Sequence, residues 1–292
     1  MTTQAIKHLE QEYDTSVRFT ARIVSSERIT AVEVDEIREI TLDVERPGFS
    51  YEVGQSIGLL APGDPQLGGH EHFRLYSVAD LPARSEQGLP RIKICVRRCN
   101  YVDEYSGEEY RGVASNYLCD LREGQEITIS GPYGLPFEVP EDHDANLILI
   151  CTSTGIAPFR AFVKHIYQNI PDWSGKVWLF FGARNPLEMI YMNDEQDDFK
   201  NYYDLDTFEA FKALSPRPHW ADPIWWDGAI GDRADELLSY FSEPKTHVFL
   251  AGLEAMRDEL DKVFSRRMGS EEKWQRRKAE LIGGKRWVEL LY

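Results

Sequence analysis

The first half of the chain alternates hydrophobic and polar positions over short runs that Gly, Pro and Asp separate. A period of two, in runs rich in β-branched residues, predicts β-strands that bury one face. Residues 113–121 have helical spacing instead. Six strands this short and this closely spaced are typical of a sandwich or barrel. The predicted strands are residues 17–30, 37–45, 55–63, 74–80, 91–99 and 126–134.

In the second half, continuous apolar runs alternate with amphipathic segments. Strands that are apolar throughout indicate a parallel sheet covered by helices on both faces. We therefore predict an antiparallel β-barrel domain over residues 1–140 and an α/β, parallel-sheet, nucleotide-binding domain over residues 141–292. The apolar runs are residues 146–154, 176–184 and 246–252, and the helical segments are residues 157–170, 232–241 and 253–268.

Composition narrows the class of protein. A chain of 292 residues with 42% hydrophobic and 28% charged residues is typical of a globular protein of one large or two ordinary domains. Its net charge of −16 argues against nucleic acid or an anionic membrane as a partner. The sequence has no signal-peptide core and no apolar run of about 20 residues, so we expect a cytoplasmic protein. The four cysteines lack Cys-x-x-Cys spacing, which favours free thiols, and no metal site is predicted.

The first apolar run of the second half ends in Thr152-Ser-Thr-Gly155, and Pro158 then opens a helix. Such a turn can present backbone N–H groups to an anion, usually a phosphate, although a plain strand-to-helix connection would have a similar sequence. In an open parallel sheet, ligands bind beyond the carboxyl ends of the strands. The position of this turn therefore favours an anion site.

Three side chains in the fourth predicted strand could hold a flat cofactor. Alternation along Arg74-Leu75-Tyr76-Ser77 places Arg74 and Tyr76 on one side and Ser77 on the other. Arg74 can bind a diphosphate, Tyr76 can pack on a ring system and Ser77 can hydrogen-bond the edge of that ring. An ordinary strand with one outward arginine is the alternative.

Small residues precede the predicted helix of the first half. At residues 112–115, Gly-Val-Ala-Ser would let a phosphate approach the backbone N–H groups, and Ser115 adds a hydroxyl. Taken alone, this segment also fits a plain helix cap. Tyr101 is a candidate aromatic platform, and the three tryptophans in residues 220–226 fit either core packing or a lid over an adenosine.

Seven short motifs together resemble the plant-type ferredoxin–NADP(+) reductase family. The resemblance covers residues from about 17 to the C-terminus, and although each motif is weak alone, all seven follow the family's order and approximate spacing. The motifs are RLYS, CVRRCNY, GVASNYLCDL, GPYG, TSTGIAPFRAF, AGLEAM and WVELLY. The resemblance implies a FAD-binding barrel domain followed by an NADP(H)-binding domain.

The resemblance also implies roles for individual residues. Ser77 would lie near the flavin N5, Tyr76 would stack on the isoalloxazine, and Ser77 and Glu289 would be the catalytic residues, with Glu289 handling protons. Tyr292 would cover the flavin. The other implied FAD contacts are Arg74, Leu75, Cys95, Val96, Arg97, Tyr101, Gly112, Val113, Ala114 and Ser115; the implied NADP(H) contacts are Thr154, Leu253, Ser215 and Arg217.

The sequence departs from the family pattern in several places. Ser153 replaces a glycine, Ala251 replaces a cysteine, and Gly228-Ala229 stand where a later lysine and tyrosine are usual. Two leucines, rather than one residue, separate Glu289 from Tyr292. The missing lysine and tyrosine imply weaker discrimination between NADPH and NADH, but Ser215 and Arg217 still favour NADP, because arginine and hydroxyl groups bind a 2′-phosphate.

The implied activity is transfer of electrons from NADPH, through FAD, to a one-electron carrier. No Cys-x4-Cys-x2-Cys motif is present, so the carrier, a ferredoxin or flavodoxin, would be a separate chain. We also expect the reductase to be a monomer or a weak dimer. A basic run, residues 266–278, fits either a solvated helix or a surface for an acidic carrier. The alternatives are an NADH-preferring reductase component of an oxygenase system and a non-catalytic flavin-binding module.

Overall fold

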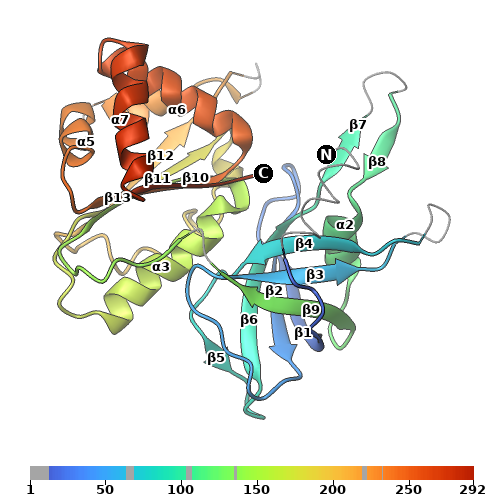
Figure 1. Ribbon diagram of the computed structural model, residues 1–292. Coiled ribbons are helices and arrows are strands. Elements are labelled where there is room, and N and C mark those ends of the chain that lie inside the picture. The colour runs from blue at the N-terminus through green and yellow to red at the C-terminus, as the bar shows by residue number, and fades with distance from the viewer. Residues whose placement is uncertain (1–12, 64–68, 103–106, 135–136, 219–221, 232) are drawn as a thin grey trace. The chain divides into compact units, whose positions relative to one another are not determined.

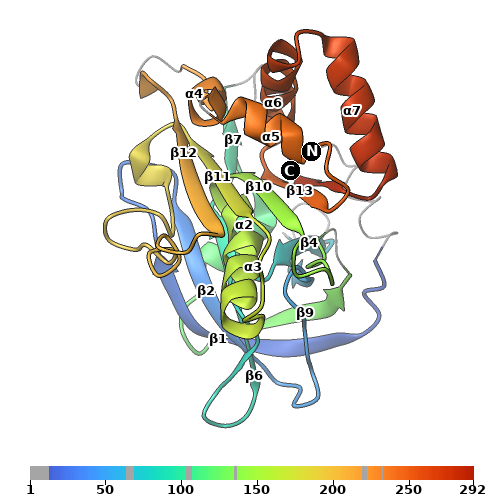
Figure 2. The same cartoon turned by 90° about the vertical axis from the view of Figure 1, so that its left-hand side faces the viewer.

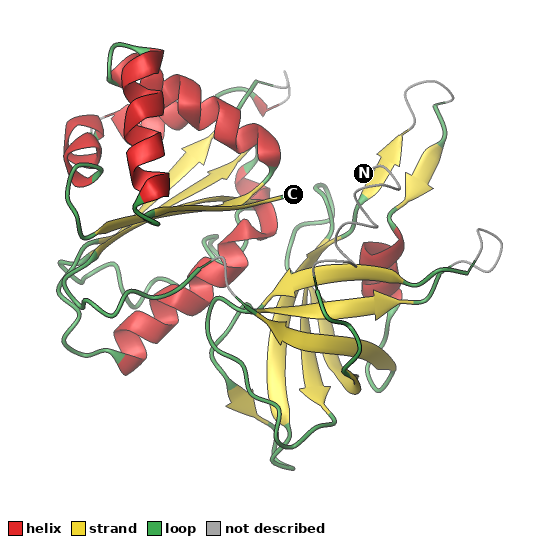
Figure 3. Ribbon diagram, in the orientation of Figure 1, coloured by secondary structure: helices red, strands yellow, loops and turns green. Residues whose placement is uncertain are grey.

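The chain divides into two compact units, Met1–Leu135 and Pro136–Tyr292. The structure is a computed structural model that describes residues 13–63, 69–102, 107–134, 137–218, 222–231 and 233–292 (Figure 1). The first unit is built on an antiparallel sheet and the second on a parallel sheet. Figure 3 shows the strands of both units in yellow and the helices in red. The predicted fold class, a barrel followed by an α/β domain, is confirmed.

The first unit contains a seven-stranded antiparallel sheet in the order β4-β3-β9-β1-β2-β6-β5. The sheet closes on itself where Val78, just after β4, forms a bridge with Ile94 of β6. Closure of this kind pairs backbone N–H and C=O groups that would otherwise be exposed at the edges of the sheet. The strands are β1 (Arg18–Arg28), β2 (Ile37–Val44), β3 (Ser56–Ala61), β4 (His72–Ser77), β5 (Ala83–Arg84), β6 (Pro90–Arg97) and β9 (Glu126–Tyr133).

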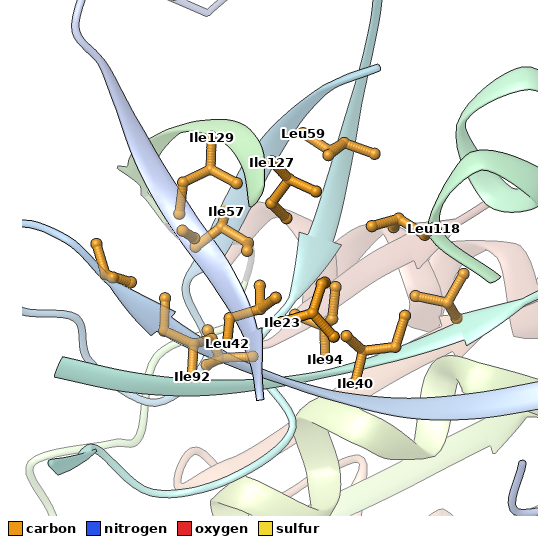
Figure 4. Packing of buried hydrophobic residues seen from close by; sticks show 14 of the residues in the cluster. Ile23, Ile40, Leu42, Ile57, Leu59, Ile92, Ile94, Leu118, Ile127 and Ile129 are labelled. Carbon is orange, nitrogen blue, oxygen red and sulfur yellow. The ribbon is translucent and has the colours of Figure 1, made fainter. Parts of the chain in front are cut away.

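Alternate residues of these strands fill the barrel. Ile40 and Leu42 of β2 and Ile92 and Ile94 of β6 are almost completely buried, and they pack with the aliphatic residues of the neighbouring strands (Figure 4). Helix α2 (Val113–Asp120) adds Leu118 to this core. All six predicted strands and the predicted helix are present. The short β5 and the hairpin of β7 (Asn100–Val102) and β8 (Glu109–Arg111) were not predicted, because they are too short for a periodic signal.

The second unit has a five-stranded parallel sheet in the order β12-β11-β10-β13-β14, and Figure 2 shows β12, β11 and β10 side by side. Every residue of β10 and β11 is buried, which explains their continuous apolar sequences. The two edge strands were not predicted, because their exposed positions break the apolar run. The strands are β10 (Asn146–Thr152), β11 (Val177–Ala183), β12 (Phe208–Leu214), β13 (Thr246–Gly252) and β14 (Trp287–Leu291).

Helices cover both faces of this sheet. In Figure 1, α3 (Ile156–Asn169) lies on one face, and α5 (Ala234–Tyr240), α6 (Glu254–Arg267) and α7 (Glu271–Gly283) lie on the other. The short elements are η2 (Ser153–Gly155), η3 (Pro186–Glu188) and α4 (Trp226–Gly231). Within the described part of the chain, no helix combines the length and the apolar character that crossing a bilayer requires.

Candidate functional site

The strand order of the parallel sheet reverses next to β10. The chain proceeds outward from β10 to β11 and β12, and then returns to place β13 on the other side of β10. In sheets of this kind, ligands bind in the crevice outside the carboxyl ends of the two strands that flank the reversal. Here those ends are Thr152 and Gly252. The topology therefore supports the ligand site that the sequence predicted after Thr152.

Two glycines allow the two strand ends to pack closely. A Cβ atom at Gly155 would lie 2.1 Å from the carbonyl oxygen of Ala251, and one at Gly252, whose φ is 139°, would lie 2.3 Å from the Thr152 Oγ1. The same Oγ1 accepts a hydrogen bond from the Leu253 N–H at 3.0 Å. The turn after β10 and the start of α6 are thus tied together.

Ser153 has a φ of 52°, in the left-handed region that favours glycine. Ser153 is one of the positions at which the sequence departs from the family pattern. The turn therefore keeps a conformation suited to glycine while it carries a serine, at a cost of about 1–2 kcal/mol.

Tyr292 lies at the same edge of the sheet as this turn. Its backbone N–H donates to the Gly252 carbonyl oxygen at 2.9 Å, and its hydroxyl is hydrogen-bonded to the Thr154 hydroxyl. The predicted site residues Thr154, Leu253 and Tyr292 are therefore brought together at the crevice.

Glu289 faces the other side of the sheet. Its Oε1 accepts a hydrogen bond from the Trp287 indole at 2.7 Å and lies 3.3 Å from the Lys278 Nζ in α7, and its Oε2 is 4.0 Å from Arg257 in α6. Alternation along β14 puts Leu290, and not Glu289, on the face of Tyr292. The second leucine in this segment is what separates the acid from the tyrosine.

Ser215 and Arg217 follow β12, and both bond to Asp222. The Ser215 hydroxyl donates to the Asp222 carbonyl oxygen at 3.0 Å, and the Arg217 Nε donates to the Asp222 carboxylate at 2.8 Å. The two predicted 2′-phosphate contacts are therefore close together, but an acid that the sequence analysis did not single out is paired with the arginine. Only its spacing of five residues from Arg217 could have drawn attention to it.

The tryptophans near this cluster differ in exposure. Trp226 is buried in the core, whereas the Trp225 side chain is 58% exposed. A Cβ atom at Gly228 would lie 2.7 Å from the Trp225 ring, so the indole lies against this glycine. The Trp225 N–H donates to the carbonyl oxygen of Leu214, the last residue of β12. Trp220 lies outside the described residues.

In the first unit, β4 positions the residues of the RLYS motif. Tyr76 packs against the barrel core, and burial raises the pKa of its phenol. Ser77 is paired with Ser56 of β3, and the two hydroxyl oxygens are 3.4 Å apart. Arg74 donates to the Phe73 carbonyl oxygen at 2.7 Å, and Leu75 is half-buried opposite Gly58. Arg74 and Tyr76 alternate with Leu75 and Ser77 along the strand.

The loop before α2 forms a small-residue cradle. The Gly112 N–H donates to the Cys99 carbonyl oxygen at 2.8 Å, and a Cβ atom at Gly112 would also lie 2.8 Å from that oxygen. The Ser115 Oγ accepts the Cys99 N–H at 3.1 Å. A cavity of about 520 Å³ opens here, and it is lined by Pro62, Gly63, Arg111, Gly112, Val113, Asn116, Tyr117 and Asp120.

Asn116 organises the polar side of this cavity, and the sequence analysis did not identify it. Its side-chain amide donates to the carbonyl oxygens of Cys99 and Gly112, and its Oδ1 accepts from Arg98 at 2.9 Å and from Arg111 at 3.1 Å. Both arginines also pair with Asp120, each at 2.8 Å. The cradle is thus held by a buried amide and two guanidinium groups.

The remaining predicted residues of the first unit lie on or near β6. Val96 is in the barrel core, and Cys95 is buried. Arg97 forms an ion pair with Asp35. Ala114 is buried in α2, and the side chain of Tyr101, in β7, lies outside the described residues.

Comparison with known proteins identifies the family. Residues 149–262 match the oxidoreductase NAD-binding domain. A ferredoxin–NADP reductase of Spirulina sp. is 31% identical over 258 residues, which cover 86% of this chain and 87% of the relative. The chain belongs to the plant-type ferredoxin–NADP reductase family. A ferredoxin–NADP reductase of Picosynechococcus sp. is 34% identical over 237 residues, which cover 78% of this chain but 58% of that relative.

A solved structure has the same fold as this chain. The ferredoxin–NADP+ reductase of Plasmodium falciparum superposes with a TM-score of 0.69 at 18% identity, covering 96% of this chain and 98% of the other. A variant of that protein was solved in complex with 2′P-AMP. The chain spans less than 60% of the length of the Picosynechococcus and Synechocystis reductases that it matches.

The basic run of this family member is largely neutralised within the second unit. Arg266 and Arg267 both pair with Asp227, and Arg277 pairs with Glu280 at 2.9 Å. The Lys278 side chain is 9% exposed, and its Nζ lies 3.0 Å from Asp261. The run is therefore neither a fully solvated helix nor a uniformly basic surface.

No group of three or more potential metal ligands occurs among the residues that the structure describes.

Proposed function

We propose that the chain is a FAD-dependent reductase that moves electrons between NADPH and a separate one-electron carrier, a ferredoxin or a flavodoxin. The observation that carries the proposal is the crevice at the strand reversal, where Gly155 and Gly252 let the ends of β10 and β13 pack closely. A pyridine nucleotide would bind there, at the carboxyl edge of the sheet. Family membership supplies the second support.

The first unit would hold the flavin. Gly112 lets the start of α2 pack against the Cys99 carbonyl oxygen, and Val113, Ala114 and Ser115 in the first turn would direct their N–H groups toward a diphosphate. Arg111 lines the same cavity and would add a positive charge. These features fit an anionic dinucleotide. A bound flavin supplies the conversion of a two-electron hydride into single electrons.

Other residues of the first unit would hold the flavin ring and the adenosine. Tyr76 would provide a flat surface for the ring, Arg74 a cation and Ser77 a hydroxyl at the reacting edge. Leu75, Cys95, Val96 and Arg97 would support the cofactor from β4 and β6, and Tyr101 would stack on the adenine.

In the second unit, Thr154 and Leu253 would contact the coenzyme at the crevice, and Ser215 and Arg217 would bind its adenosine 2′-phosphate. Tyr292 would cover a flat ring with its phenol. Glu289 would act as the acid that the family resemblance implies, with its carboxylate held by Trp287 and Lys278.

The cofactor and the activity are tested together. Denaturation of the purified yellow protein should release FAD, and NADPH should support reduction of ferricyanide and, with ferredoxin added, of cytochrome c. Release of FMN alone would contradict the cradle assignment. Bound FAD without any diaphorase activity would favour the flavin-binding module, and turnover with NADH alone would favour the oxygenase-type component.

A glycine substitution tests the cradle directly. Gly112→Val should release the flavin, because its side chain would collide with the Cys99 carbonyl oxygen. Gly48→Val is the matched control, since a Cβ atom at Gly48 meets no atom within 4 Å. Equal flavin retention by the two variants would rule out this cradle.

A further inference from the structure

The ion pair between Arg217 and Asp222 is built into the end of β12. The Asp222 Oδ2 accepts from the Arg217 Nε at 2.8 Å, and its Oδ1 accepts from a terminal nitrogen of the same guanidinium at 3.5 Å. The Asp222 carbonyl oxygen accepts the Ser215 hydroxyl. Asp222 is thus held through its backbone while its carboxylate lies beside the guanidinium.

The pair lies on the ligand-binding edge of the sheet. Ser215 directly follows β12, and its N–H donates to the carbonyl oxygen of Ala183 at the end of β11, at 3.2 Å. Trp225, bonded through its backbone to Leu214, presents an exposed indole close to the same strand end. An adenosine bound here would have an aromatic face for its base and polar groups for its ribose.

The two charged side chains of this pair favour different riboses. A carboxylate accepts hydrogen bonds from ribose hydroxyls, whereas an arginine accommodates a 2′-phosphate. A 2′-phosphate that binds Arg217 must share the guanidinium with Asp222, and it experiences repulsion from that carboxylate. A ribose 2′-hydroxyl meets neither obstacle.

We propose that Asp222 determines coenzyme discrimination by holding Arg217 and opposing the 2′-phosphate, so that NADH competes effectively with NADPH. This inference rests on the proposed function, because it takes the end of β12 as the adenosine site. The preference for NADPH over NADH is then about tenfold or less, the lower end of what one charge-assisted contact provides.

The direct test measures binding without turnover. In the flavin-loaded protein, calorimetry gives the dissociation constants of 2′-phospho-AMP and of AMP. Asp222→Asn keeps the backbone carbonyl that accepts the Ser215 hydroxyl and removes the carboxylate charge. The dissociation constant of 2′-phospho-AMP should therefore fall about tenfold, and that of AMP should change less than about threefold. Asp235→Asn, at an exposed aspartate in the first turn of α5, should change neither constant.

A double variant shows whether Asp222 acts through Arg217. Arg217→Ala should weaken the binding of 2′-phospho-AMP and leave the binding of AMP nearly unchanged. When Asp222→Asn is added to Arg217→Ala, the affinity for 2′-phospho-AMP should rise less than about twofold. The inference is overturned if Asp222→Asn leaves the ratio of the two constants unchanged, or if its full gain persists without Arg217. Steady-state rates with NADPH and NADH are measured separately, and a wild-type protein that uses neither coenzyme would refute the proposed function, while the binding ratio still decides the role of Asp222.

Discussion

The hydroxyl of Tyr292 is hydrogen-bonded to the hydroxyl of Thr154, across the strand ends where a coenzyme would bind. Thr154 is in η2, directly after β10, and Tyr292 follows β14, so the contact joins residues 138 positions apart. The bond engages the hydroxyl of Thr154, a residue that the proposed function assigns to the coenzyme. Where Thr154 is the donor of this bond, a coenzyme oxygen that accepts the same proton must replace it.

Tyr292→Phe should consequently tighten coenzyme binding. The variant keeps the ring but frees the Thr154 hydroxyl, and one neutral hydrogen bond is worth about 0.5–1.5 kcal/mol. We expect the dissociation constant of NADP+, measured by calorimetry, to fall severalfold. Thr154→Val is the companion variant and should weaken binding, because it removes the hydroxyl itself. Unchanged affinity in both variants would show that Thr154 does not contact the coenzyme.

Ser153→Gly should stabilise the protein. Ser153 has a positive φ, and glycine relieves about 1–2 kcal/mol of strain while it loses about 0.4–1 kcal/mol through a more flexible unfolded chain. The expected net gain in the free energy of unfolding is about 0–1.6 kcal/mol. Ser153→Val should instead destabilise, since a β-branched residue tolerates this region poorly. Chemical denaturation of both variants checks the signs, and a destabilised Ser153→Gly would contradict the strain argument.

Ser77→Ala should slow flavin reduction far more than it weakens FAD binding. Losing one positioned hydrogen-bond donor can raise a barrier by about 2–4 kcal/mol. Rapid-mixing measurements with NADPH report the rate, and flavin retention reports binding. Ser56→Ala is a matched control, because Ser56 is the hydroxyl neighbour of Ser77 in β3. Equal rates for the two variants would make Ser77 a structural residue.

The cradle of the first unit should weaken in acid. Hydrogen bonding from Arg98 lowers the pKa of Glu36; burial works to raise the pKa of Asp120, but its bonds to Arg98 and Arg111 lower it overall. Carboxyl groups whose pKa is lower in the folded state stabilise it above their unfolded pKa, near 4. That contribution is lost as the pH falls through the folded pKa values.

Thermal unfolding and flavin release, followed from about pH 6 down to pH 3, measure this loss. In the wild type both should change steeply at the acid end. Arg98→Gln should flatten the dependence, because it removes the guanidinium that both carboxylates share. The same slope in both proteins would place the acid sensitivity elsewhere.

Trp225→Ala should weaken NADPH and NADH equally. Stacking of a base on an aromatic side chain is worth about 1–3 kcal/mol, and both coenzymes carry the same adenine. KM values for both should rise at least fivefold, about 1 kcal/mol. Ile282→Ala, at an exposed apolar residue of α7, serves as the control and should leave both unchanged. A selective loss of NADPH alone would mean that Trp225 acts near the 2′-phosphate instead of stacking.

Much of the fold was predictable because hydrophobic periodicity is a local signal. The alternating pattern of β2 and the continuous apolar runs of β10 and β11 each predicted a strand and its class of sheet. The turn at Thr152–Gly155 was also recognisable, because a glycine and hydroxyl residues directly follow a buried strand. The edge strands β12 and β14 were missed, since partial exposure removes the pattern.

The sequence by itself determined the residue types at the crevice and the cradle, and with them the two classes of domain. Only the tertiary structure decided which charges are already paired. Arg217 was predicted as a 2′-phosphate contact, and Asp222 lies against it; Glu289 was predicted as the catalytic acid, and it pairs with Lys278 on the face of β14 opposite to Tyr292. The turn that brings Asp222 against Arg217, and the packing that brings Lys278 of α7 to Glu289, are set by tertiary folding, and local periodicity gives neither.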